Sequence, residues 1–132
     1  MQAFMIAGTH SGCGKTIVTL GVCSALVKRG IAVQTFKAGP DFIDAGIHRL
    51  ASGRNAINLD LWMCGEDTVR ATFCRYAPLG DLSVIEGVMG LFDGTHCSAA
   101  LAGILGVPVI LVIDAFGMAE SAAAVVYGYA TW

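Results

Sequence analysis

Apolar runs of strand length alternate along this chain with segments that have helical periodicity. The strand-like runs cover about 2–7, 31–37, 82–86 and 108–113, and the helical segments cover about 15–29, 66–76, 98–105 and the residues from about 118. Gly30 and Gly106 follow two of the helical segments, as glycines commonly do where a helix stops. Strands that alternate with helices in this way form parallel sheets with crossover connections, so the pattern predicts one α/β domain.

The most apolar segments of the chain are short. The run over 107–113 is apolar almost throughout, and we expect it, like 82–85, to be a central strand covered on both faces. Apolar residues make up 55% of the 132 residues, yet no uninterrupted run reaches the roughly 18–20 residues of a membrane-spanning helix. Met1 to Ala7 carries no basic leader and has the pattern of a strand, so we expect a cytoplasmic protein without a signal peptide.

Charge and cysteine content exclude two further classes of function. The net charge is −2 and the basic residues are scattered, so we expect no nucleic-acid binding. The five cysteines are odd in number and contain no C-x-x-C pair, which favours reduced thiols over a disulfide framework or a zinc site. The three histidines, His10, His48 and His96, show no metal-ligand spacing.

The segment Gly8–Thr16, with the sequence G-T-H-S-G-C-G-K-T, lies between the first apolar run and the first helical segment. Its glycines let backbone N–H groups turn toward phosphate oxygens, and the start of the following helix adds its positive dipole end. Lys15 would reach the β- and γ-phosphates, and the Thr16 hydroxyl would ligate Mg²⁺. Gly8 stands one residue earlier than in the common phosphate loop, where Thr9 now lies. The segment predicts a nucleoside triphosphate site, and a glycine-rich turn before an ordinary helix is the alternative.

Two more polar segments follow predicted strands, at 36–44 and 86–94, and all three should meet at one edge of the sheet. Glu86 directly follows an apolar run, where a carboxylate can hold Mg²⁺ beside the phosphates. The glycines that surround Glu86 indicate a backbone shaped for close approach to a ligand. The alternative for Glu86 is an exposed acid at the end of a strand.

Three charged residues after the second predicted strand have roles that the sequence leaves open. Asp41 and Asp44 could share a metal or orient a substrate, or they could form a turn and the N-terminal cap of a helix over 45–51. Lys37 could contact a phosphate or a substrate carboxylate, or it could be a solvated charge. The N-L-D sequence at 58–60 is interpreted as a polar loop that leads to an apolar anchor.

Four motifs together resemble the cobyrinic acid a,c-diamide synthases. They are G-T-H-S-G-C-G-K-T at 8–16, F-K-A-G-P-D-F-I-D at 36–44, N-L-D at 58–60 before Trp62–Met63, and E-G-V-M-G-L-F-D-G at 86–94. The resemblance spans nearly the whole chain, and the related dethiobiotin synthetases share the displaced first glycine. It implies a P-loop fold with a parallel sheet, and it implies that residues 1–132 form the N-terminal portion of an ATP-binding amidoligase domain.

Carried over residue by residue, the resemblance assigns roles to three groups. The triphosphate would be bound by Thr9, Ser11, Gly12, Cys13, Gly14, Lys15 and Thr16. Mg²⁺ would be held by Thr16, Asp41 and Glu86. The catalytic residues would be Lys15, Lys37, Asp44 and Asp93, the last three along the path of the activated carboxylate. Asp93 would recognise which side chain is presented, unless it only forms the turn before Gly94.

The resemblance also implies a reaction. In the family, ATP phosphorylates a peripheral carboxylate of a corrin precursor of cobalamin, and ammonia from glutamine then displaces the phosphate to leave a carboxamide. The glutamine-hydrolysing domain of family members has no counterpart in these 132 residues. We therefore expect an incomplete domain that is inactive alone, with an apolar surface left exposed or covered by a partner chain, which could be a second copy.

Other functions remain open at this point. Nickel-sirohydrochlorin a,c-diamide synthase performs the same chemistry on a different tetrapyrrole, and these motifs do not separate it from the corrin enzyme. Dethiobiotin synthetase fits the segments at 36–44 and 86–94 less well. A partitioning-type ATPase, which switches partner binding by nucleotide-dependent dimerisation, shares the loop and the sheet, but it usually has an additional lysine where this sequence has His10.

Overall fold

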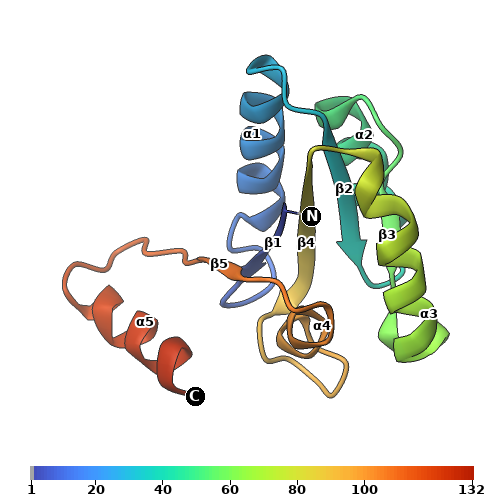
Figure 1. Ribbon diagram of the computed structural model, residues 1–132. Coiled ribbons are helices and arrows are strands. Elements are labelled where there is room, and N and C mark those ends of the chain that lie inside the picture. Colours follow the sequence, from blue (N-terminus) through green and yellow to red (C-terminus); the bar gives the residue numbers. More distant parts are fainter. Residues whose placement is uncertain (1) are drawn as a thin grey trace.

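The computed structural model describes residues 2–132 and contains a five-stranded parallel sheet (Figure 1). In chain order the strands are β1 (Gln2–Gly8), β2 (Val33–Ala38), β3 (Ile57–Leu59), β4 (Leu82–Gly90) and β5 (Val109–Val112). Across the sheet their order is β3-β2-β4-β1-β5. The predicted α/β class with crossover helices is therefore confirmed.

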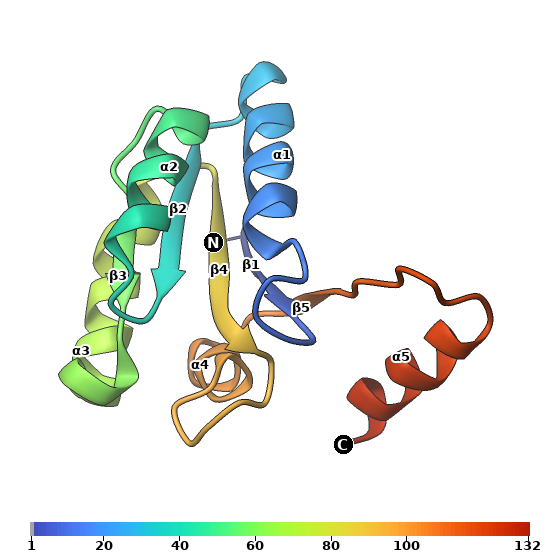
Figure 2. The ribbon, with the colours of Figure 1, turned by 180° about the vertical axis from the view of Figure 1, so that it is seen from behind.

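Helices cover both faces of the sheet. They are α1 (Lys15–Lys28), α2 (Phe42–Ser52), α3 (Leu61–Tyr76), α4 (Ser98–Leu105) and α5 (Ser121–Thr131), with a 3₁₀ turn at Ala77–Leu79. Helices α1 and α2 pack together on one face, and α3 and α4 lie on the other (Figure 2). Helix α5 follows an extended segment and belongs to neither layer, and its Tyr129 contacts the rest of the fold by stacking on Phe92 and by donating to the Thr9 carbonyl oxygen at 2.6 Å. Among residues 2–132, no helix has the length and apolar character needed to cross a bilayer.

Each face of the sheet has its own apolar cluster. The larger one, on the side of α3 and α4, contains Met5, Phe36, Leu59, Phe73 and Leu101. The smaller one, on the side of α1, contains Ile6, Cys23, Val33 and Val84. On this second face, the buried residues at the carboxyl ends of β2 and β4 are polar, because Lys37 and Glu86 take the places of apolar side chains. Burial of polar groups at that edge marks the position of the site.

Two consecutive elements, strand β3 and helix α3, differ from the prediction. The interpretation of N-L-D as a loop is wrong, because Ile57–Leu59 is strand β3 and pairs with β2. Three residues are too few to show a strand pattern in the sequence. Helix α3 begins at Leu61 instead of near 66, and the Asp60 carboxylate caps its first turn. Gly65 has φ 75 inside this helix and interrupts the periodicity that would have revealed the turn.

The two strands that the apolar pattern marked as central have different positions. Strand β4 is central, but it runs to Gly90 instead of ending at Glu86, because its pairing with β1 continues as far as Gly8. Strand β5 lies at the edge of the described sheet, and Ile110 is 50% exposed. The prediction of a central β5 is therefore wrong. Helix α5, in which no described residue is buried, does not cover it.

Candidate functional site

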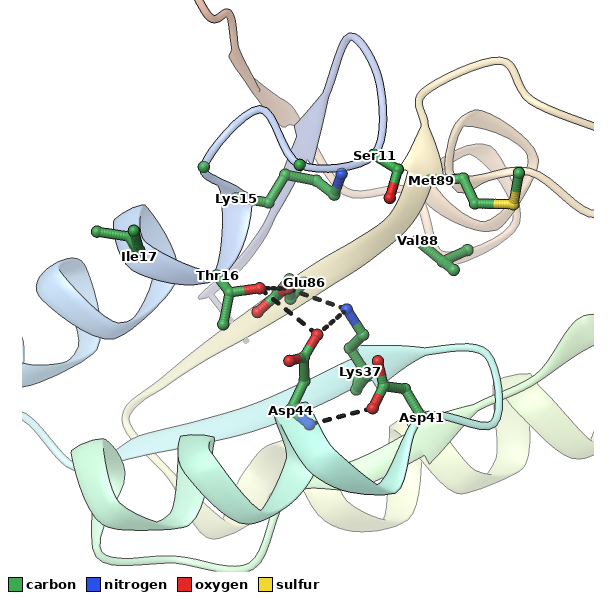
Figure 3. Close-up of a pocket in the computed structure, with 12 residues that line it drawn as sticks. Ser11, Lys15, Thr16, Ile17, Lys37, Asp41, Asp44, Glu86, Val88 and Met89 are labelled. Carbon is green, nitrogen blue, oxygen red and sulfur yellow. Dashed lines mark hydrogen bonds and ion pairs between the residues drawn. The ribbon is translucent and has the colours of Figure 1, made fainter.

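A cavity of about 360 Å³ opens at the carboxyl edge of the sheet, where the three polar segments meet (Figure 3). It is lined by Ser11, Gly12, Gly14, Lys15, Thr16, Ile17, Lys37, Asp41, Asp44, Glu86, Val88 and Met89. These residues come from the loop after β1, from β2 and β4, and from the starts of α1 and α2. All of them except Ile17, Val88 and Met89 are residues that the sequence had indicated as site residues.

The loop after β1 has the backbone geometry that phosphate binding needs. Gly14 has φ 97 at the N-terminus of α1, and in the described structure no side chain caps this helix, so its first N–H groups are free to bind an anion. Gly8 permits the loop to fold back, since a Cβ there would lie 2.2 Å from the Cys13 sulfur. Lys15 is 7% exposed, and its Nζ donates to the His10 carbonyl oxygen at 2.9 Å. The ammonium charge therefore lies within the loop.

Glu86 occupies the centre of the site. The parallel register pairs it with Ile6 on β1 and with Lys37 on β2, and its side chain is completely buried. Its Oε1 accepts hydrogen bonds from the Thr16 hydroxyl at 2.7 Å and from the Lys37 ammonium at 2.9 Å. The alternative of an exposed acid at a strand end is therefore wrong, because β4 continues past Glu86 and side chains from α1, α2 and β2 contact its carboxylate.

Lys37 is 3% exposed, so the alternative of a solvated charge is also wrong. Besides Glu86, its Nζ contacts Asp44 Oδ2 at 2.8 Å and donates to the Gly87 carbonyl oxygen at 3.2 Å. The Thr16 hydroxyl lies 3.5 Å from the same Asp44 oxygen. Figure 3 shows Thr16, Lys37, Asp44 and Glu86 pointing toward one another. These four residues are called the Glu86 cluster below.

Burial and pairing act in opposite directions on the charges of the Glu86 cluster. Burial raises the pKa of Glu86, but hydrogen bonds from His48 and Thr16 and the charge of Lys37 outweigh it and lower the pKa from 4.5 to about 2. Burial lowers the pKa of Lys37. Its hydrogen bond to Asp44 and the charge of Glu86 have the larger, opposite effect, so the pKa of Lys37 lies above its ordinary value. Both side chains are therefore ionised at neutral pH.

The lowered pKa of Glu86 predicts a loss of stability in acid. Because the folded state holds the pKa of Glu86 below 4.5, this group stabilises the fold above that pH, and its contribution disappears as the pH falls toward about 2. We expect Glu86→Gln to remove on the order of 2–3 kcal/mol of pH-dependent stability from this window. Calorimetric melting temperatures between pH 6 and pH 2 would measure it. Glu66→Gln is the matched control, since Glu66 is 53% exposed. If both variants reduced the pH dependence of the melting temperature equally, the effect could not be assigned to Glu86.

Asp41 has the capping role that was the alternative to metal binding. Its carboxylate accepts hydrogen bonds from the N–H groups of Ile43 and Asp44, at 2.9 and 3.1 Å, and so starts α2. Asn58, on β3, donates to the carbonyl oxygens of Gly39 and Asp41 at 2.8 and 3.0 Å and holds the turn before the helix. Asp41 still lines the cavity, so its predicted role toward Mg²⁺ stays a prediction.

Three predicted site residues lie outside the lining of the cavity. The Thr9 hydroxyl lies beside the adjacent histidine ring, and the Cys13 sulfur contacts the Val112 carbonyl oxygen at 3.7 Å. The Asp93 carboxylate accepts a hydrogen bond from the Gly90 N–H at 2.7 Å, which is the turn-forming role that was its alternative. Their assignments to the nucleotide and to substrate recognition stay predictions.

The sequence interpretation missed His48. Its ring is completely buried, and its Nε2 lies 2.5 Å from Glu86 Oε2. Sequence reasoning looked only for spacing among the histidines and found none. The available signal was that His48 follows Asp44 by one helical turn, which places both side chains on the same face of α2.

The chemistry of the Glu86 cluster fits a divalent cation that keeps water and phosphate ligands. Among residues 2–132 no group of three or more histidine, cysteine or acidic side chains could hold a metal by itself. The cluster offers one hydroxyl and two carboxylates, and two acids against one lysine leave a net charge of −1. Mg²⁺ is typically bound through one or two carboxylates together with waters and substrate phosphates.

A loop with free N–H groups that opens a helix after the first strand of a parallel sheet, beside a buried carboxylate, defines a nucleotide-binding domain of the P-loop class. Residues 4–132 match the CbiA family, described as the CobQ/CobB/MinD/ParA nucleotide binding domain. The chain belongs to this family.

Several curated relatives are diamide synthases. The chain is 54% identical over 96% of its length to a cobyrinate a,c-diamide synthase of Syntrophotalea carbinolica, and 47% identical over 97% to one of Caldanaerobacter subterraneus. It is 45% identical over 97% to a hydrogenobyrinate a,c-diamide synthase of Streptomyces coelicolor. The chain spans 29%, 29% and 28% of the lengths of these relatives. The resemblance inferred from the four motifs is confirmed.

Proposed function

We propose that this domain binds ATP with Mg²⁺ and phosphorylates a peripheral carboxylate of a corrin, as the ATP-binding part of a cobyrinate a,c-diamide synthase. The observation that carries the proposal is the meeting of the phosphate loop and the Glu86 cluster in one cavity. The names of relatives that are 45–54% identical supply the substrate class. The wider activity would belong to the full-length protein, of which residues 1–132 would be the nucleotide-binding portion.

Each part of the cavity has a role in this proposal. The N–H groups around Gly12 and Gly14 and the Lys15 ammonium would bind the triphosphate. Thr16 and Glu86 would hold Mg²⁺, with Asp41 and Asp44 beside it. When bound, Mg²⁺ would neutralise negative charge on the β- and γ-phosphates.

The chemistry divides into two displacements. An oxygen of the substrate carboxylate attacks the γ-phosphorus, the bond to the β-γ bridging oxygen breaks, and ADP leaves. Ammonia then attacks the acyl carbon of the acyl phosphate, loses a proton, and displaces inorganic phosphate. In this domain Lys15 would stabilise charge on the transferred phosphoryl group, and Lys37 and Asp44 would position the carboxylate, as catalysis of phosphoryl transfer depends mainly on positioning and charge.

The ammonia would come from glutamine hydrolysed elsewhere in the full-length protein, in the cytoplasm where ATP and glutamine are available. The names of the relatives differ in the substrate, which is cobyrinate for the Syntrophotalea carbinolica protein and hydrogenobyrinate for the Streptomyces coelicolor protein. The four motifs are common to synthases for these tetrapyrroles and for nickel sirohydrochlorin, so the choice of substrate is left to the experiment below.

A competition assay with the full-length protein tests the proposed function. We expect formation of an a,c-diamide from a corrin, dependent on ATP, Mg²⁺ and glutamine, with ADP and phosphate released once for each amide. Cobyrinate, hydrogenobyrinate and nickel sirohydrochlorin would be offered together, and the products separated by mass spectrometry. ATP hydrolysis that needed a membrane or DNA and ignored every tetrapyrrole would contradict the proposal and favour a partitioning-type switch, which the family description also covers.

The proposed metal role of Glu86 predicts an increased Mg²⁺ requirement in Glu86→Gln. The amide keeps the size of the side chain but removes the negative charge beside Thr16. We expect the Mg²⁺ concentration at half-maximal amidation to rise by at least about 10-fold, as for changes in groups that hold a metal. A Mg²⁺ titration of the steady-state rate measures this, and an unchanged midpoint would count against the role.

A further inference from the structure

Helix α2 packs against the sheet with a polar face. Its buried residues are His48 and Ser52, and Asp44 lies one turn before His48. Three of its four large apolar residues point outward, since Phe42 is 84%, Ile43 is 77% and Leu50 is 86% exposed, whereas Ile47 is half-buried. The apolar contacts of α2 with the core therefore come from smaller or half-buried side chains, such as Ala51, which packs against the smaller apolar cluster. Two polar contacts also connect α2 to the sheet, namely the ion pair of Asp44 with Lys37 on β2 and the hydrogen bond of His48 with Glu86 on β4.

The two oxygens of the Glu86 carboxylate have separate partners. Oε1 accepts from Thr16 and Lys37, which line the cavity, whereas Oε2 lies 2.5 Å from the Nε2 of His48, which is not among the lining residues. A carboxylate can only accept, so the proton in this contact belongs to Nε2. Within the described structure, His48 Nδ1 is buried and has no partner. A bare Nδ1 fits that environment better than a second N–H would, since buried N–H groups without an acceptor are the rarer case.

We propose that His48 is a positioning residue that fixes the orientation of the Glu86 carboxylate, so that Oε1 faces Thr16 and the cavity. The inference rests on the proposed function, in which Glu86 holds Mg²⁺. Through the same contact, His48 ties α2, which carries Asp44, to β4, which carries Glu86. Carboxylates that bind metals are commonly oriented by a second hydrogen bond of this kind.

A role in packing alone accounts poorly for His48. The ring is completely buried, and a buried nitrogen without a hydrogen-bond partner costs free energy that an apolar side chain of similar size would not. His48 compensates for that cost only through its bond to Glu86. The hydrogen bond to Glu86, and not the filling of space in the core, therefore explains why a histidine occupies this position.

The tautomer of His48 in the unaltered full-length protein gives a first test. Nitrogen-15 spectra of histidine-labelled protein, with Glu86→Gln used to identify the His48 resonances, report which ring nitrogen carries the proton. We expect a protonated Nε2 and a bare Nδ1. A bare Nε2 would overturn the proposal, because such a ring cannot donate to Glu86. The tautomer itself is read in the unaltered protein, and the variant serves only to assign the resonances.

Two substitutions in the full-length protein test the function of the contact. His48→Leu fills the site without a donor, whereas the amide of His48→Gln reaches about as far as Nε2. We expect His48→Leu to raise the Mg²⁺ concentration at half-maximal amidation by about 10-fold or more, and His48→Gln to restore most of the loss. Binding of a fluorescent ATP analogue in EDTA should change by less than about 3-fold, because the His48 side chain is hydrogen-bonded to Glu86 and, in the described structure, to no residue of the phosphate loop. His96→Gln, in an exposed loop, is the control.

The double variant His48→Leu/Glu86→Gln separates the possible failures. If His48 acts through Glu86, the double variant should have the Mg²⁺ midpoint of Glu86→Gln alone. Two results would overturn the positioning role and leave the proposed function intact. One is a double variant in which the shifts of the Mg²⁺ midpoint add. The other is a folded His48→Leu whose midpoint is unchanged while Glu86→Gln shifts it. Unchanged midpoints in both single variants would contradict the metal role of Glu86, and the positioning role with it.

Discussion

Replacement of Lys15 with alanine is expected to lower the rate of amidation by the full-length protein by about 10²–10³-fold, the loss that follows removal of one preorganised stabilising group from an active site. The ammonium lies within the phosphate loop, where its Nζ is held by the His10 carbonyl oxygen and the side chain is 7% exposed. A charge placed in this way needs little rearrangement to meet a phosphate, and alanine would leave the γ-phosphoryl charge unbalanced as the bond to ADP breaks.

The control for Lys15→Ala is Lys28→Ala, which removes an exposed lysine from the other end of α1. Steady-state amidation should be unaffected in Lys28→Ala. Glutamine hydrolysis in the same preparation, measured without the corrin, should stay detectable in Lys15→Ala, because the proposed source of ammonia lies elsewhere in the protein. Amidation by Lys15→Ala at a rate near that of the unaltered protein would refute the role given to this lysine.

The sequence predicted the phosphate loop and its neighbours because their signals are local. The helix start at Lys15 and the glycines before it are adjacent along the chain, so the geometry of the loop is encoded within nine residues. The convergence of Lys37 and Glu86 followed from a general rule, since the carboxyl ends of parallel strands share one edge of a sheet. The register that makes these two residues direct neighbours is a tertiary property.

The parts that the sequence did not predict depend on contacts between distant segments. The length of β4 beyond Glu86 is set by its pairing with β1, and the exposure of β5 by the position of α5. His48 escaped notice because its partner lies 38 residues away on another element. The polar face of α2 runs against the usual expectation that a helix buries its apolar side, and only the structure shows which face is covered.

Replacement of Lys37 with methionine is expected to destabilise the domain by about 3–5 kcal/mol, the usual cost of removing one partner from a buried ion pair. The Lys37 side chain is 4% exposed and that of Glu86 is completely buried, so water cannot take the place of the lost ammonium. By contrast, the Arg70–Glu66 pair on α3 is 51% and 53% exposed, and Arg70→Ala should change stability by less than about 0.5 kcal/mol. Calorimetric unfolding of the full-length protein, followed in the transition of this domain, provides the measurement.

The stability deficit of Lys37→Met is the free energy of unfolding that this variant loses. Its pH dependence separates loss of charge pairing from loss of packing. Without the lysine, the pKa of Glu86 should rise from its value of about 2, because the charge of Lys37 is one of the causes that lower it. The variant then takes up a proton at a higher pH than the unaltered protein, so its deficit should shrink as the pH falls from 6 toward 3. Removing the charge of Glu86 by substitution should also reduce the deficit at neutral pH. We therefore expect Lys37→Met/Glu86→Gln to recover part of the stability that Lys37→Met loses. A deficit that stayed constant with pH and was unchanged in the double variant would mean that Lys37 contributes through its packing, and the electrostatic account of the Glu86 cluster would fail.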